Sequence, residues 1–101
     1  MASPFLSIVV PMREGFSAHW FEELLKVQNT DSGTVEFILI HPPGVRPEPC
    51  DDPRMRQLVS PFRGEIIQRL TGMINASGTY LITFNCDEYI NPEVPALAER
   101  Y

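Results

Sequence analysis

The segment FNCDEYINP, residues 84–92, places two adjacent carboxylates directly after a run of strand-forming residues. Carboxylates at the end of a buried parallel strand can hold a divalent cation, which binds a diphosphate and neutralises charge as a leaving group departs. An acidic pair in this position also occurs at ordinary solvated strand ends. Asp87 and Glu88 therefore make this segment a candidate metal and phosphate site, with a solvated strand end as the alternative.

Four strands are expected in the chain. The runs are rich in β-branched and other apolar residues, and proline, glycine or polar residues bound them. They span residues 5–11, 34–40, 55–60 and 79–84.

Helices are expected between these strands. Residues 17–29 form an amphipathic pattern that Ser17 is placed to cap, and residues 64–78 carry isoleucine, leucine and methionine at helical spacing. Gly78 stands where a helix ends in a left-handed turn. Asn91 followed by proline predicts the start of a last helix that runs to the end of the chain.

This alternation of strand and helix predicts an α/β fold. Strands separated by helices imply right-handed crossovers and a mostly parallel, twisted sheet of about four strands with helices on both faces. Residues 41–53 contain five prolines and are expected to form a stiff surface loop. A chain of 101 residues supports one modest core, so we expect residues 1–101 to form a single domain.

Composition narrows the possible partners. The net charge of −5 and the lack of a basic cluster argue against binding to nucleic acid or to anionic membranes. The longest apolar runs are too short for a transmembrane segment, and the chain start lacks a secretion signal, which predicts a cytoplasmic location. Cys50 and Cys86 are too few for a disulfide framework and are expected to be reduced thiols.

In parallel sheets ligands bind at the carboxyl ends of the strands. The four segments that follow the expected strands are PMREG, HPPG, SPFRG and NCDEY. No glycine-rich phosphate loop follows the first strand, where Gly15 stands alone, so a dinucleotide fingerprint or P-loop is not expected.

The order of these features resembles the family 2 glycosyltransferases, which bind a nucleotide sugar on a GT-A fold. Their sequences open with a VVIPxYNE-like segment, which SIVVPMREG resembles, and their second strand resembles EFILIHPPG. Their pattern ARNxGIxxAxGxYIxFLDADDxxxP is similar, without a gap, to residues 68–92. The matching residues include Arg69, Gly72, Ala76, Gly78, Tyr80, Asp87 and Pro92. The resemblance covers only the amino-terminal, nucleotide-sugar-binding half of the family's Rossmann-like fold.

This resemblance implies a hexosyltransferase-type activity, in which a sugar passes from a UDP- or GDP-linked donor to an acceptor. Residues 85–87 would occupy the family's D-x-D motif, with Asp87 as the ligand of Mg²⁺ or Mn²⁺. The nucleobase and ribose would lie beside residues 11–14. The residues that the resemblance implies for nucleotide binding are Pro11, Arg13, Glu14, His41, Arg69 and Asn85.

Three positions depart from the family pattern. Arg13 stands where tyrosine is common, and His41 or Pro42 replaces the aspartate that reads the base. Asn85 replaces the first aspartate of D-x-D; its amide can bond a ribose hydroxyl but brings no charge to a cation, so metal affinity should fall. His41 as a simple loop residue and Arg69 as a solvated helix residue remain open alternatives.

Two hypotheses follow. In the first, residues 1–101 are a GT-A-like nucleotide-binding domain, truncated at its C-terminal end, whose parent supplies the acceptor site and general base from later chain. No catalytic base can be named within these residues, and general-base catalysis needs one. In the second, the chain is a non-catalytic GT-A-like module for binding or assembly. Exposed helix faces would favour a homo-oligomer.

Overall fold

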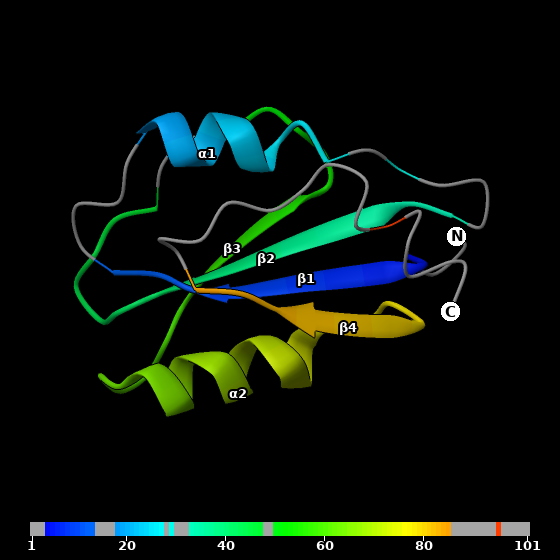
Figure 1. The fold of residues 1–101 in the computed structure, drawn as a ribbon. Helices are drawn as coiled ribbons and strands as arrows, with labels where there is room; N and C mark the ends of the chain where they lie inside the picture. Colours follow the sequence, from blue (N-terminus) through cyan, green and yellow to red (C-terminus); the bar gives the residue numbers. More distant parts are fainter. Residues whose placement is uncertain are drawn as a thin grey trace.

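A four-stranded sheet forms the centre of the chain (Figure 1). The computed structural model describes residues 4–13, 18–27, 29, 33–47, 50–85 and 95. The elements in chain order are β1 (Leu6–Pro11), α1 (Ala18–Leu24), β2 (Val35–His41), β3 (Met55–Val59), α2 (Glu65–Asn75) and β4 (Tyr80–Thr83). The four expected strands and the first two expected helices are confirmed. The expected cap at Ser17 and the start of the last helix at Asn91 lie outside the described residues.

All strand pairs in the sheet are parallel, and the strand order is β3-β2-β1-β4. Helix α1 covers one face of the sheet and α2 covers the other (Figure 1). The chain therefore has the expected α/β, Rossmann-like fold. Crossovers between parallel strands are right-handed as a rule. No described helix is long and apolar enough to span a membrane.

The two faces of the sheet differ in the size of their cores. On the α1 face, Trp20 and Leu24 pack with inward-facing residues of β1 and β2 in one large cluster. On the α2 face, the buried cluster among the described residues consists of Val9, Ile38 and Ile40. Alternating side chains along each strand supply both faces, as expected for strands buried on two sides.

Gly72 allows α2 to lie close to the smaller core. A Cβ atom at this position would stand 2.4 Å from Cδ1 of Ile40 and 2.5 Å from Cγ1 of Val9. These separations are well inside van der Waals contact. A larger residue would therefore force the side chains of Ile40 and Val9 to shift, and glycine allows the close approach of helix and sheet without this.

Gly78 also serves a close approach, and the expectation of a left-handed helix end there was wrong. The helix is capped at Ala76, whose backbone is extended, and Gly78 does not have a positive φ. A Cβ atom on Gly78 would lie 2.6 Å from the backbone nitrogen of Ser7. Its own N–H donates to the Ser7 hydroxyl at 2.8 Å, so the absence of a side chain lets the chain enter β4 directly beside β1.

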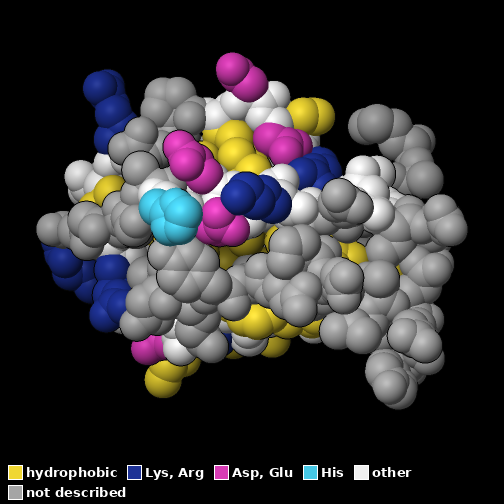
Figure 2. Space-filling model, turned by 45° about the horizontal axis from the view of Figure 1, so that its top comes forward, with side chains coloured by type: hydrophobic (Ala, Val, Ile, Leu, Met, Phe, Trp, Pro, Cys, Tyr) yellow, Lys and Arg dark blue, Asp and Glu magenta, His cyan; other side chains and the backbone are white. Residues whose placement is uncertain are grey.

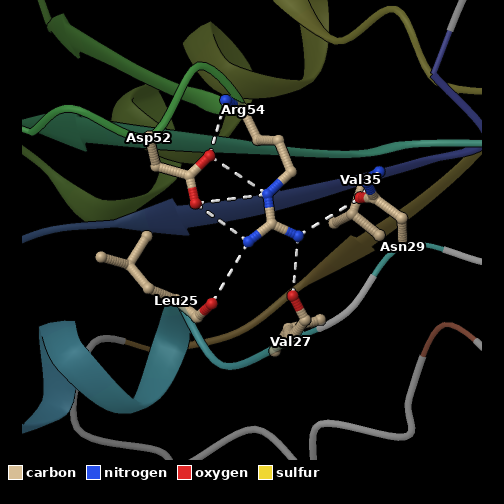
Figure 3. Close-up of polar contacts among 6 residues, drawn as sticks. All are labelled: Leu25, Val27, Asn29, Val35, Asp52 and Arg54. Atoms are coloured by element: carbon tan, nitrogen blue, oxygen red, sulfur yellow. Dashed lines mark hydrogen bonds and ion pairs between the residues drawn. The ribbon is translucent and has the colours of Figure 1, made fainter.

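Arg54 joins the end of α1 to the start of β3 (Figure 3). Its guanidinium donates hydrogen bonds to the carbonyl of Leu25 at 3.2 Å, the carbonyl of Val27 at 2.7 Å and the carboxylate of Asp52 at 2.9 Å. The hydrogen bond from the Arg54 side chain holds the pKa of Asp52 below its ordinary value. Helix α1 ends at Leu24, before residue 29, where the sequence pattern placed its end, and Arg54 satisfies carbonyls that follow the helix.

Glu36 is a buried carboxylate on the α2 face of β2, with 6% of its surface exposed. It accepts hydrogen bonds from the Ser7 hydroxyl at 2.5 Å, the backbone N–H of Ser77 at 3.0 Å and the guanidinium of Arg56 at 2.8 Å. Burial acts to raise the pKa of Glu36, but these donors outweigh it and hold the pKa below its ordinary value. One charged group thus ties β1, β2, β3 and the segment before β4 together.

Candidate functional site

The carboxyl ends of the four strands meet at one edge of the sheet, because all the strands are parallel. The strand arrows in Figure 1 point toward this edge, on the left of the view. Ligands of open parallel sheets bind outside this edge, where the strand order reverses. Here β2 and β3 lie on one side of β1 and β4 lies on the other, so the reversal falls between β1 and β4.

Pro11 ends the pairing of β1 with β4 at this point. The last β1–β4 bond runs from the Phe84 N–H to the Val9 carbonyl, at 3.1 Å. In a parallel ladder the next bond would run from the N–H of residue 11 to the Phe84 carbonyl, but proline has no N–H. The β1–β4 ladder therefore cannot continue through residue 11. Pro11 is itself buried, and the exposed Arg13 follows it.

Arg69, on α2, reaches the carboxyl end of β4 and contacts Asn85. Its Nη2 donates to Oδ1 of Asn85 at 3.0 Å and to the carboxylate of Glu65 at 2.6 Å, while Nη1 donates to the hydroxyl of Thr83. A quarter of the Arg69 side chain, 25%, remains exposed, so the guanidinium lies at the surface. Two residues expected at a nucleotide site are thus in direct contact, beside the strand reversal.

His41 is fully buried at the end of β2. Its Nε2 lies 2.8 Å from Oε1 of Gln57, and its carbonyl accepts the Ser60 N–H at 2.9 Å. Strand alternation places its side chain on the α1 face with Phe37 and Leu39. A contact between His41 and a base requires the residues around it to move, and this assignment stays a prediction.

Gln68 was not among the residues expected at this edge, but it links the ends of two strands there. Its Nε2 donates to the carbonyls of Met12 and Ile40, both at 2.8 Å, so one side chain of α2 holds the ends of β1 and β2 together. Gln68 is 5% exposed. A sequence signal existed: Gln68 and Gly72 stand one helical turn apart, on the side of the helix opposite its apolar residues.

Exposed arginines follow each of the first three strands. They are Arg13 after β1, Arg46 after β2 and Arg63 after β3. Figure 2 keeps the left and right of Figure 1 and shows dark-blue Lys and Arg side chains along the left edge, toward which the strands point. Magenta acidic side chains lie mostly over the middle and upper part of that view. Among the described residues, three exposed arginines therefore lie in the segments that follow strand ends.

Two of the expected site residues, Glu14 and Asp87, lie outside the described residues, as does Cys86. Within the described part of the chain, no three His, Cys, Asp or Glu side chains gather into a group that would hold a metal ion. The expected role of Asp87 as a metal ligand remains a prediction.

The comparisons with known proteins point to one fold. No family model and no curated protein matches the sequence. Among solved structures, S. aureus TarS 1–349, a glycosyltransferase, is similar with a TM-score of 0.70 and 17% sequence identity. The match covers 95% of this chain and 31% of that chain, so the chain spans about a third of the length of its structural relative. At this identity the likeness shows a shared fold.

Proposed function

We propose that this chain is the nucleotide-sugar-binding part of a family 2-like glycosyltransferase, and that the nucleotide lies between the carboxyl ends of β1 and β4. The observation that carries the proposal is the contact between Arg69 and Asn85 at the point where the strand order reverses. The shared fold with a glycosyltransferase supports it.

The residues around the strand reversal suit a nucleoside diphosphate. A guanidinium binds phosphate oxygens through paired, charge-assisted hydrogen bonds, and Arg69 and Arg13 both lie beside the reversal. Because Pro11 has no N–H to extend the β1–β4 ladder, we assign the base and ribose to the position just beyond its last bond. Asn85 can bond a ribose hydroxyl, since its amide offers both donors and an acceptor.

A divalent cation is part of this proposal. Asp87 follows Asn85 by two residues and is the carboxylate assigned to hold Mg²⁺ or Mn²⁺, which would neutralise charge on the leaving diphosphate. Asn85 contributes no charge, so we expect weaker metal binding than a pair of aspartates would give. No residue among 1–101 is assigned to bind the acceptor or to act as the general base that activates it.

A non-catalytic GT-A-like module is the second candidate, and one observation favours it. The amide of Asn85 stands where the motif calls for a carboxylate, and its Oδ1 accepts a hydrogen bond from Arg69. An arrangement of this kind can stabilise the end of β4 without holding a metal ion. In that case nucleotide binding would be lost and the chain would serve binding or assembly.

Calorimetric titration with UDP, GDP and their hexose conjugates, with and without Mn²⁺, separates the two candidates. We expect binding of at least one nucleotide, strengthened by Mn²⁺, and a loss of the Mn²⁺ effect in Asp87→Ala. The matched control is Asp51→Ala, an exposed aspartate that precedes β3 and so lies away from the carboxyl edge. No binding of any nucleotide in either metal condition would reject the first candidate and leave the second.

A further inference from the structure

The apolar side chains of α2 face away from the sheet. The buried residues of the helix are Gln68 and Gly72, and Leu70 is two positions from each. Two positions correspond to a rotation of about 200°, so Leu70 lies on the opposite side of the helix. Figure 1 shows α2 as the outermost layer below the sheet, and Leu70 is 47% exposed.

Five residues make up this outward face, called here the α2 stripe. Their exposed fractions range from 38% at Ile67 to 82% at Ile74. The stripe consists of Ile66, Ile67, Leu70, Met73 and Ile74.

The stripe is large enough for a small interface. Its five side chains expose on the order of 500 Å² of apolar surface, which matches the largest patches on typical monomers, and such patches are often functional. A standard interface buries about 800 Å² on each partner. Phe62, 68% exposed before the helix, adds apolar surface near the N-terminal end of the stripe. The stripe is therefore smaller than one side of a standard interface and suits a weak, reversible dimer.

The spacing of the stripe is symmetric about Leu70. Its other members stand three and four residues before Leu70, at Ile67 and Ile66, and three and four residues after it, at Met73 and Ile74. Two copies of α2 packed antiparallel, with a two-fold axis at Leu70, would pair Ile66 with Ile74 and Ile67 with Met73. A two-fold interface requires this kind of self-complementary surface.

Charge does not oppose such a pairing. Glu65 and Arg69 are the charged residues of α2, and both lie outside the stripe. They form an ion pair with each other at 2.6 Å, so the flank of the stripe carries no net charge. Two stripes can therefore meet without burying a charge or opposing like charges.

We propose that the α2 stripe is the interface between two copies of this chain, packed antiparallel about Leu70. The proposal goes beyond nucleotide binding and does not depend on it. The partner is a second copy of the chain, whose α2 stripe has the same residue spacing and runs in the opposite direction.

Sedimentation equilibrium of the 101-residue chain over a range of concentrations tests the proposal. We expect a monomer–dimer equilibrium. Ile66→Lys and Ile74→Glu should each weaken the dimer by about tenfold or more, because each places unpaired charges against apolar side chains. Both positions are highly exposed, at 74% and 82%, so circular dichroism should show folding unchanged. Val59→Lys, at an exposed position on β3 outside the stripe, is the control.

The register is tested by mixing the two variants. In a mixed dimer the lysine at position 66 faces the glutamate at position 74, and the other pair stays apolar, so dimerisation should return. A monomer at every concentration, or a dimer that neither substitution weakens, would overturn the proposal. Loss of the dimer in each variant without recovery in the mixture would overturn the antiparallel pairing about Leu70.

Discussion

Arg69 on α2 donates a hydrogen bond of 3.0 Å to the side-chain carbonyl of Asn85, a residue 16 positions later that follows β4. The bond joins a helix on one face of the sheet to the strand that lies beyond the reversal of strand order. The bond holds the guanidinium in one position at the carboxyl edge, where it can contact a phosphate. Pre-positioned groups bind with a smaller loss of side-chain entropy.

Replacing Arg69 should weaken nucleotide binding. Charge-assisted hydrogen bonds contribute about 1.5 to 3 kcal/mol, so Arg69→Met should lower the affinity for UDP or GDP by about tenfold or more. Arg69→Lys should recover only part of it, because an ammonium lacks the paired geometry. Calorimetry provides the measurement, with Lys26→Met, an exposed cation at the end of α1, as the control. Equal affinities in all four proteins would place Arg69 outside the site.

Glu36→Gln should change the pH dependence of stability. The pKa of Glu36 is lower in the folded chain than its ordinary value of 4.5, so its contribution is present above that pH and is lost as the pH falls through the folded-state pKa. We expect the substitution to lower the free energy of unfolding by about 1 to 3 kcal/mol at pH 7, and this loss should shrink below about pH 4.5. Urea unfolding at pH 7, 5 and 3 measures it, with the exposed Glu22→Gln as control. A constant difference across this range would contradict the prediction.

Gly72→Ala should destabilise the fold although alanine favours helices. The gain in helix propensity is about 1 kcal/mol, whereas forcing a methyl group into a packed contact costs about 1 to 3 kcal/mol. The new Cβ would stand 2.4 Å from Ile40, so we expect a net loss and a lower melting temperature. Thr71→Ala, a neighbouring substitution away from this contact, should be close to neutral. Stabilisation by Gly72→Ala would mean that α2 does not pack this closely.

Arg54→Lys should loosen the end of α1. Lysine cannot bond Asp52 and the carbonyls of Leu25 and Val27 at once, because its ammonium lacks the planar fork of donors. We expect a loss of about 1 to 2 kcal/mol and faster amide exchange in residues 18–27. Arg46→Lys, in the exposed loop after β2, should leave both the stability and the amide exchange of residues 18–27 unchanged. Equal protection in the two variants would show that Arg54 does not hold this helix end.

The order of strands and helices and the parallel sheet could be predicted from the amino-acid sequence. β-Branched runs such as residues 5–11 and 34–40 favour buried strands through local sterics and apolarity, and the helices between them leave parallel pairing as the sterically favoured arrangement. The sequence also placed Arg69 and Asn85 among the candidate site residues, through a motif whose spacing is visible along the chain.

Which face of α2 is buried could not be predicted from the sequence, because it depends on how the helix packs against the sheet. Apolar periodicity identifies two faces of a helix but does not say which neighbour each face meets. Gly72 allows an approach that a larger side chain would block, and Gln68 binds strand carbonyls, so the polar, small-residue face packs on the sheet and the apolar stripe points outward. Long-range contacts of this kind, including the bond between Arg69 and Asn85, arise only when separate elements are packed together.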